Sequence, residues 1–247
     1  MDNLTVCIPT SVMRTAPDTC LVKYVIDKLY DKAPIKGCPI VISYDYNPKR
    51  FGNVADKYLE NLISMGKVRG IKIVYSSPLP GWNTGQRQSF LNMTNVDTPY
   101  LLHFEHDWVF NEYVPIDKIV EAMKCYSINY VAFNKRKNVK RGCDYILKPS
   151  NITNPYLLMS SRYSNNPHIS TRDFWQVRIR NILEQCKNVL NSHVTERPVY
   201  NSYVRDIKRE GFDCAHAKWR TYVYGKMNQG PIISHIDGHK WTPAKVR

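Results

Sequence analysis

The stretch Tyr100-Leu-Leu-His-Phe-Glu-His-Asp107 joins a short apolar run to a Glu-His-Asp tripeptide. A nearly continuous apolar run of this length is typical of a strand that is buried on both faces of a sheet. Acidic residues that follow such a strand directly lie at its carboxyl end, where open α/β sheets bind their ligands. This stretch therefore predicts both the fold class and the position of a site.

Apolar, β-branched runs alternate with amphipathic stretches from residue 4 to about residue 135, which is the pattern of a mainly parallel sheet flanked by helices. Strands are predicted over residues 4–8, 39–44, 71–76, 100–104 and 130–134. Helices are predicted over residues 20–29, 54–65, 85–92 and 116–126. Beyond residue 140 we expect a loop-rich stretch over 142–168, then helices near 172–190 and 199–210.

The composition favours a single soluble domain. The chain has 247 residues, of which 43% are apolar, enough to bury one sizeable core. The N-terminus lacks the charged and long apolar parts of a signal peptide, and no run reaches membrane-spanning length, so we expect a cytoplasmic protein. The seven cysteines are scattered and form no C-x-x-C pair for zinc or redox chemistry, so a reducing compartment fits best.

The formal charge of +14 suits phosphate-bearing ligands, an anionic membrane surface or nucleic acid, and charge alone does not choose among them. Residues 134–141, Asn-Lys-Arg-Lys-Asn-Val-Lys-Arg, form the densest basic cluster. A solvated loop is the favoured interpretation of this cluster, and contact with a polyanion is the alternative. We expect no nucleic-acid partner. Peripheral contact with a membrane and the oligomeric state both stay open.

Polar residues follow four of the predicted strands. Because the carboxyl ends of parallel strands meet at one edge of a sheet, these residues form the candidate site. Glu105 and Asp107 could hold Mn²⁺ or Mg²⁺, since these cations need few protein oxygens and complete their shell from phosphates and water. A helix cap or turn is the alternative for an isolated pair of acids, and the position after the fourth strand favours the metal site. The strand-end residues are Pro9-Thr10-Ser11, Asp45, Asn83 to Arg87, and Glu105-His106-Asp107.

Several other sites are disfavoured by their motifs. The sequence contains no G-x-x-x-x-G-K-[ST], no G-x-G-x-x-G, no H-E-x-x-H and no G-x-S-x-G. His103-Phe-Glu105 matches the H-x-E of zinc deaminases, but no P-C-x-x-C follows, so a zinc ion would lack its other ligands. These absences argue against a phosphate-loop enzyme, a zinc deaminase or a nucleophilic hydrolase.

The order of the motifs resembles the GT-A glycosyltransferases, in particular the family-2-like group, which transfers sugars with inversion. Leu4-Thr-Val-Cys-Ile-Pro-Thr10 is similar to the first strand of that family, which lies under the nucleotide. Asn83-Thr-Gly-Gln-Arg87 resembles its Asn-x-Gly followed by Arg near the donor. Residues 95–107 resemble the run that ends in Asp-x-Asp, with Glu105 in the first place. The likeness is strongest over residues 4–110 and weak beyond 140.

The resemblance implies a GT-A fold in one domain over residues 1–247, with a donor-binding half (1–110) and an acceptor half with a closing C-terminal segment (111–247). Asp107 would be the principal ligand of Mn²⁺ or Mg²⁺, with Glu105 and His235 as further ligands. His235 belongs to a late segment in which it shares one side with Asp237 and His239. The nucleotide-sugar would bind at Pro9, Thr10, Ser11, Asp45, Asn83, Arg87, Glu105 and His106, with Asp45 reading the base.

The resemblance also implies that Glu196, which precedes a helix ending at Gly211, is the catalytic base. A carboxylate that stabilises the start of a helix is an equally good interpretation of Glu196. His168, Arg172 and Trp175 lie in a polar and aromatic stretch and are candidates for binding the acceptor, with packing as the alternative.

The predicted function is therefore metal-dependent, inverting transfer of a sugar from a UDP- or GDP-sugar to a hydroxyl of a saccharide or glycoconjugate. Two other functions stay open. One is a metal-dependent nuclease or nucleotidyltransferase in which Asp45, Glu105 and Asp107 hold the ions. The other is a non-enzymatic module that binds a polyanion through residues 135–141.

Overall fold

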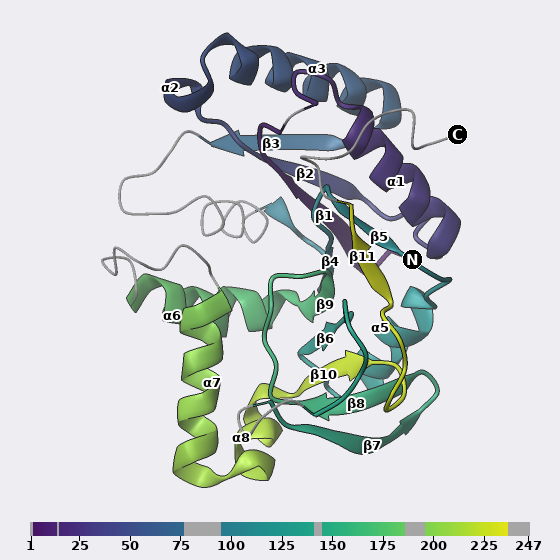
Figure 1. Ribbon diagram of the computed structural model, residues 1–247, viewed down its shortest axis with the longest axis vertical. Helices are drawn as coiled ribbons and strands as arrows, with labels where there is room; N and C mark the ends of the chain where they lie inside the picture. Colours follow the sequence, from purple (N-terminus) through teal and green to yellow (C-terminus); the bar gives the residue numbers. More distant parts are fainter. Residues whose placement is uncertain (1, 14, 77–94, 141–144, 186–195, 237–247) are drawn as a thin grey trace.

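The computed structural model describes residues 2–13, 15–76, 95–140, 145–185 and 196–236. A nine-stranded sheet crosses the molecule in the order β3-β2-β1-β4-β9-β6-β10-β8-β7, and β11 pairs with β5 in a small second sheet (Figure 1). The strands are β1 (Leu4–Thr10), β2 (Ile40–Asp45), β3 (Lys72–Ser76), β4 (Tyr100–His103), β5 (Trp108–Phe110), β6 (Tyr130–Ala132), β7 (Leu147–Thr153), β8 (Tyr156–Ser160), β9 (His168–Thr171), β10 (Thr221–Tyr224) and β11 (Ile233–His235). The helices are α1 (Cys20–Lys32), α2 (Pro48–Phe51), α3 (Asn53–Arg69), α5 (Ile116–Cys125), the π-helix η1 (Phe174–Ile179), α6 (Arg180–Gln185), α7 (Glu196–Glu210) and α8 (Phe212–Trp219).

The first four strands of the chain are parallel. β2 and β4 pair with opposite sides of β1, and β3 pairs with β2. The chain thus builds outward from β1 to β3 and then returns to the other side of β1 with β4. The carboxyl ends of β1 and β4 flank this reversal, and such a point is where open α/β sheets bind ligands. The predicted α/β fold class is confirmed.

The second half of the chain extends the same sheet. β9 is antiparallel to both β4 and β6, whereas β10 is parallel to β6. The structure corrects the loop expected over residues 142–168, because β7 and β8 form an antiparallel hairpin there. β7 contains Lys148 and Pro149 and has an irregular register between Pro149 and Thr153, so its sequence shows no regular alternation of apolar and polar residues.

The helix predictions over residues 20–29, 54–65, 116–126 and 199–210 are confirmed by α1, α3, α5 and α7. η1 and α6 occupy the described part of the helix expected over 172–190, and α8 was not predicted. The helix expected over 85–92 lies outside the described residues. No helix in the described part of the chain is long and apolar enough to cross a membrane.

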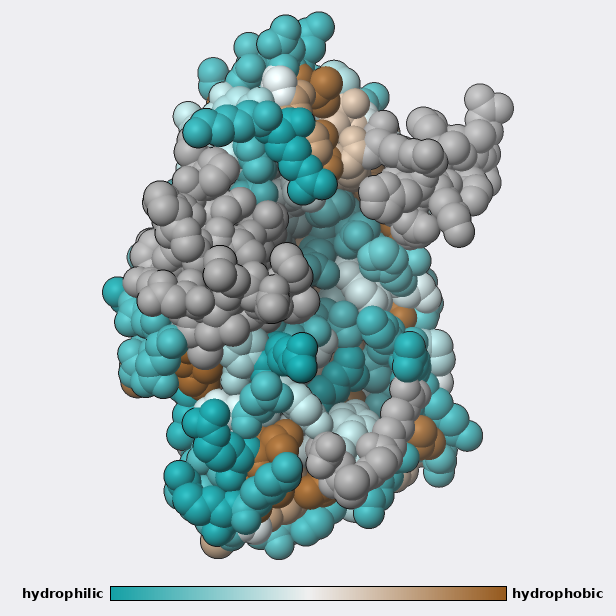
Figure 2. Space-filling view, turned by 60° about the vertical axis from the view of Figure 1, so that its left-hand side comes forward, coloured by the Kyte–Doolittle hydropathy of each residue, from teal (hydrophilic) through white to brown (hydrophobic). Residues whose placement is uncertain are grey.

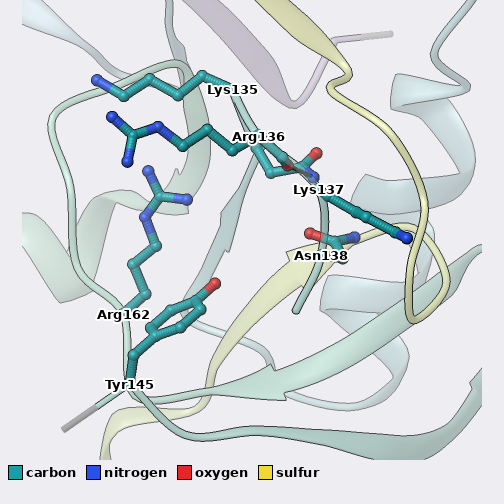
Figure 3. A pocket seen from close by; sticks show the side chains of 7 residues that line it. Lys135, Arg136, Lys137, Asn138, Tyr145 and Arg162 are labelled. Atoms are coloured by element: carbon teal, nitrogen blue, oxygen red, sulfur yellow. Dashed lines mark hydrogen bonds between the residues drawn. The ribbon is translucent and has the colours of Figure 1, made fainter. Parts of the chain in front are cut away.

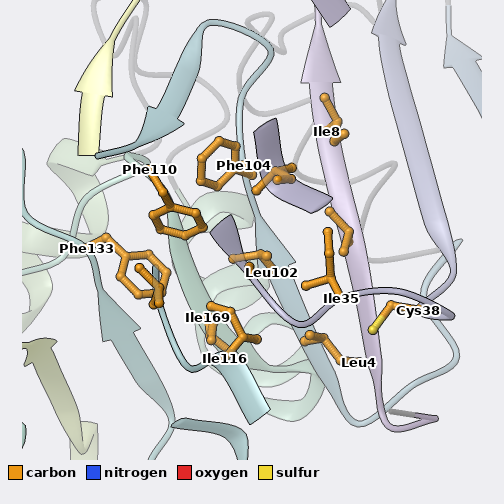
Figure 4. Close-up of a cluster of buried hydrophobic side chains, with 14 of the residues drawn as sticks. Leu4, Ile8, Ile35, Cys38, Leu102, Phe104, Phe110, Ile116, Phe133 and Ile169 are labelled. Carbon is orange, nitrogen blue, oxygen red and sulfur yellow. The ribbon is translucent and has the colours of Figure 1, made fainter. Parts of the chain in front are cut away.

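Strand side chains alternate between two cores. On one face, Leu4, Leu102 and Ile169 pack with residues of α1 and α5 in the cluster drawn in Figure 4. On the other face, Leu101 and Tyr130 pack with residues of η1, α6, α7 and α8. Successive residues of a strand point to opposite faces, so the same apolar runs contribute to both cores. This double burial explains why the strands read as continuous apolar runs.

Candidate active site

The end of β1 is tied to the segment that follows β4. The backbone N–H of His106 donates a hydrogen bond to the carbonyl oxygen of Pro9 at 3.3 Å, and the Nδ1 atom of His106 lies 3.0 Å from the same oxygen. Burial lowers the pKa of His106, which favours a neutral ring whose Nδ1–H donates to that carbonyl. The structure therefore brings Pro9 and His106 together at the point where the sheet reverses direction.

Asp107 contacts a histidine that lies far away in the sequence. The Nε2 atom of His235 is 2.8 Å from Oδ2 of Asp107, across a separation of 128 residues. The antiparallel pairing of β11 with β5 places His235 opposite Trp108, and the backbone N–H of Ile236 donates to the Asp107 carbonyl at 2.6 Å. The side chains of Asp107 and His235 are 20% and 47% exposed, so the pair is accessible from solvent.

Glu105 is oriented by the neighbouring tryptophan. The indole N–H of Trp108 donates to Oε2 of Glu105 at 2.9 Å. Burial raises the pKa of Glu105 to about 8, and the negative charge of Asp107 acts in the same direction. The hydrogen bond from Trp108 and the charge of Lys135 oppose this rise, and the Lys135 ammonium lies 5.5 Å from the centre of the Trp108 ring. Glu105 is therefore mostly protonated at neutral pH.

Asp107 and His235 fit a site for Mn²⁺ or Mg²⁺. The 2.8 Å contact between Oδ2 and Nε2 is a hydrogen bond, and a cation held by both atoms would replace its proton. Within the described ranges no group of three or more His, Cys, Asp or Glu side chains is arranged to hold a metal ion. Two protein ligands suffice for these cations where phosphate oxygens and water complete the shell.

Two other strand-end residues are buried. The Thr10 hydroxyl oxygen lies 2.8 Å from the Tyr58 hydroxyl, which ties the end of β1 to α3. Asp45 is 4% exposed at the end of β2, where it pairs in register with Ser76 of β3. Ser11 is partly buried after β1. Asn83, Arg87, Asp237 and His239 lie outside the described residues.

Glu196 begins α7 and is held by the loop that connects β8 to β9. Its Oε1 atom accepts hydrogen bonds from the Ser164 hydroxyl at 2.5 Å and from the Asn165 backbone N–H at 2.6 Å. The charge of Glu196 is close enough to contribute to the raised pKa of Glu105. Glu196 therefore couples the second half of the chain electrostatically to the carboxyl group at the end of β4.

His168 and Trp175 are core residues. They are 0% and 2% exposed, and His103, His168 and Trp175 form a stack with ring centroids 4.9 Å and 5.8 Å apart between neighbours. Arg172 is bound to the loop before β4, with its guanidinium donating to the Asp97 carbonyl at 2.9 Å. β9 lies between β4 and β6 under η1, so the acceptor surface expected at His168 and Trp175 is instead packing.

The sequence did not single out Trp108, Lys135, Ser164 and Asn165. Trp108 directly follows the acidic tripeptide, and its position there is the one signal that could have indicated a contact. Lys135 belongs to the basic cluster that was interpreted as a solvated loop. Ser164 and Asn165 contact Glu196 only because β8 and β9 bring their loop to the start of α7.

The sequence matches no protein-family model and no curated protein. Residues 1–349 of S. aureus TarS are 12% identical, with a TM-score of 0.45 over 74% of this chain and 50% of that one. The mannosyltransferase PcManGT from Pyrobaculum calidifontis, solved with GDP-Man and Mn²⁺, is 11% identical, with a TM-score of 0.43 over 90% of this chain and 56% of that one. A putative glucose-1-phosphate thymidylyltransferase from Bacillus anthracis is 12% identical, with a TM-score of 0.48 over 90% of this chain and 98% of that one. This chain therefore spans about half the length of the first two chains and 36% of a longer TarS chain.

Proposed function

We propose that this chain is a glycosyltransferase that moves a sugar from a nucleoside-diphosphate sugar to an acceptor hydroxyl, with a divalent cation and with inversion. The observation that carries the proposal is the Asp107–His235 pair, 2.8 Å apart and solvent-accessible, at the reversal point of a parallel sheet. Ligands of α/β sheets bind at that point. The carboxylate suits both Mn²⁺ and Mg²⁺, whereas the imidazole favours a transition metal such as Mn²⁺ over Mg²⁺.

Asp107 and His235 would hold the cation between them. When bound, the cation neutralises the negative charge that develops on the diphosphate as it leaves the sugar. The Trp108 indole holds the Glu105 carboxyl next to this pair, where burial and the charge of Asp107 raise the pKa of Glu105 in the absence of a cation.

Glu196 would act as the base. As the acceptor oxygen attacks the anomeric carbon, the bond from that carbon to the diphosphate oxygen breaks, and the hydroxyl proton passes to the Glu196 carboxylate. The donors on Oε1, Ser164 and Asn165, fix the orientation of this carboxylate. In this scheme residues 1–110 bind the donor, through Pro9, Thr10, Ser11 and Asp45 as well as the tripeptide, and residues 111–247 bind the acceptor.

The test is calorimetric titration with UDP- and GDP-sugars in the presence of Mn²⁺ or EDTA. We expect binding that requires the cation, loss of that binding in Asp107→Ala, and wild-type affinity in Asp117→Asn. Asp117 lies in the first turn of α5. Its replacement by asparagine removes one negative charge, as Asp107→Ala does, but at a position away from the site. Absence of cation-dependent binding for every nucleotide-sugar, with full activity in Asp107→Ala, would falsify the proposal.

The nuclease alternative needs Asp45, Glu105 and Asp107 to share one or two ions. In the described part of the chain these carboxylates do not form such a group. Incubation of a labelled oligonucleotide with the protein and Mg²⁺ separates the two functions, and we expect the oligonucleotide to stay intact.

A further inference from the structure

A cavity of about 250 Å³ lies beside the candidate site and is rich in positive charge. Figure 3 shows the guanidinium groups of Arg136 and Arg162 turned toward one another, with Lys135 extending to the same side and Lys137 pointing away. The lining residues are Asn134, Lys135, Arg136, Lys137, Asn138, Tyr145 and Arg162. The cavity therefore joins the basic cluster of residues 134–138 to a residue that follows β8.

Two buried asparagines fix the backbone that carries these cations. The Asn138 side chain donates to the carbonyls of Tyr224 and Lys226 at 3.1 Å and 3.2 Å, and the Asn134 carbonyl accepts from Ile232 N–H at 2.9 Å. Asn134 and Asn138 are 2% and 1% exposed, whereas residues 135–137 between them are exposed. The cluster is therefore a solvated loop, as predicted, and its two buried asparagines anchor the backbone that presents the cations.

The charges in the cavity are uncompensated. Among the described residues, Lys135, Arg136 and Arg162 form no ion pair with a carboxylate, and the Oδ1 atoms of Asn134 and Asn138 are buried without a hydrogen-bond partner. Two guanidinium groups that face each other repel, and a phosphate between them would form charge-assisted bonds with both.

Two cations of the cavity are connected to carboxylates of the candidate site. On one side, Lys135 stacks over Trp108, which holds Glu105. On the other side, Arg162 begins the loop whose residues Ser164 and Asn165 hold Glu196. An acceptor must reach both the base and the donor, so this is the position that its binding group would occupy. The volume is below the roughly 300–1,000 Å³ of pockets for drug-sized ligands, which suits one anionic group rather than a whole nucleotide-sugar.

We propose that this cavity binds a phosphate or phosphodiester of the acceptor, so that the acceptor is a phosphorylated saccharide or glycoconjugate. The proposal rests on the proposed function for the identity of the bound molecule as an acceptor. The binding of phosphate itself depends only on Arg136, Arg162 and the anchored segment, and it can be measured whether or not the chain transfers a sugar.

The experiment compares sn-glycerol 3-phosphate with glycerol as probes, by calorimetry, in three proteins. These are the wild type, Arg136→Gln/Arg162→Gln, and the matched control Lys140→Gln/Lys124→Gln, which removes two exposed positive charges that do not line the cavity. We expect glycerol 3-phosphate to bind the wild type and the control equally and to bind the arginine variant at least tenfold more weakly. Glycerol should bind none of them.

A parallel titration with UDP or GDP and Mn²⁺ identifies the source of the phosphate. We expect nucleotide affinity to be unchanged in the arginine variant, since the diphosphate belongs at Asp107 and His235. Loss of nucleotide affinity in that variant would assign the cavity to the donor and overturn the proposal. An equal loss of affinity for glycerol 3-phosphate in the arginine variant and in the lysine control would also overturn the proposal, because binding would then depend only on net charge. If Arg162→Gln lowers the melting temperature and so impairs folding, the same two titrations are made with Arg136→Gln alone, and the same changes in affinity are expected. Failure of nucleotide binding in the wild type would reject the glycosyltransferase function and leave the phosphate result standing.

Discussion

Replacement of His103 by phenylalanine should make the protein more resistant to acid. His103 is buried against His168 and Trp175, and burial lowers its pKa to about 4. In the unfolded chain the pKa is about 6.5, so between these two values the unfolded state binds a proton that the folded state does not. The free energy of unfolding therefore falls as the pH drops below 6.5, by ~1.4 kcal/mol per pH unit, or roughly 2 kcal/mol at pH 5.

Phenylalanine keeps the ring stack and cannot titrate. It also removes the hydrogen bond between His103 and the Asn165 backbone, which costs about 1 kcal/mol at every pH. Urea unfolding at pH 8, 7, 6 and 5, followed by tryptophan fluorescence, gives the difference in free energy between the two proteins. We expect this difference to be constant above pH 7 and to move by roughly 2 kcal/mol in favour of the variant at pH 5. A difference that stays constant down to pH 5 would refute the burial argument.

Three further changes test the fold and the site. Gly66→Ala places a Cβ 2.7 Å from the Ile71 carbonyl oxygen, so α3 must move away from β3. The free energy of unfolding in urea should fall by ~1–3 kcal/mol. Unchanged stability would contradict the close contact. Tyr58→Phe removes the buried hydrogen bond to the Thr10 hydroxyl, and urea unfolding should show a free energy of unfolding lower by about 1 kcal/mol. An unchanged free energy of unfolding would show that this hydrogen bond adds nothing to stability. Trp108→Phe removes the donor to Glu105, so NMR of the ¹³C-labelled carboxyl should show a pKa above about 8; a lower pKa would contradict the role of the indole.

The parallel half of the fold could be predicted because its strands are buried on both faces. Every residue of β1 is buried, so the sequence from Leu4 to Thr10 shows a nearly unbroken apolar run. β5 and β11 have only three residues each and depend on pairing with one another, and so short a segment has no period that could be detected. The order of strands in the second half was also not predictable, because β9 enters between two earlier strands.

The candidate site shows the same division between local and distant determinants. The clustering of Pro9 with the residues after β4 follows from parallel strands, whose carboxyl ends lie at one edge. The pairing of Asp107 with His235 was expected only from the resemblance of the late segment to a glycosyltransferase family. The basic cavity could not be predicted, since Arg136 and Arg162 meet only when the Asn138 side chain anchors one segment and β8 delivers the other.

The pairing of β11 with β5 makes the site depend on the order in which the chain is synthesised. Asp107 leaves the ribosome 128 residues before His235, which at ~5–20 residues per second is an interval of roughly 6 to 26 seconds. β1 to β4 can pair during that time, whereas the partner of Asp107 does not yet exist. A nascent chain would thus acquire its parallel core first and its carboxylate–imidazole pair last.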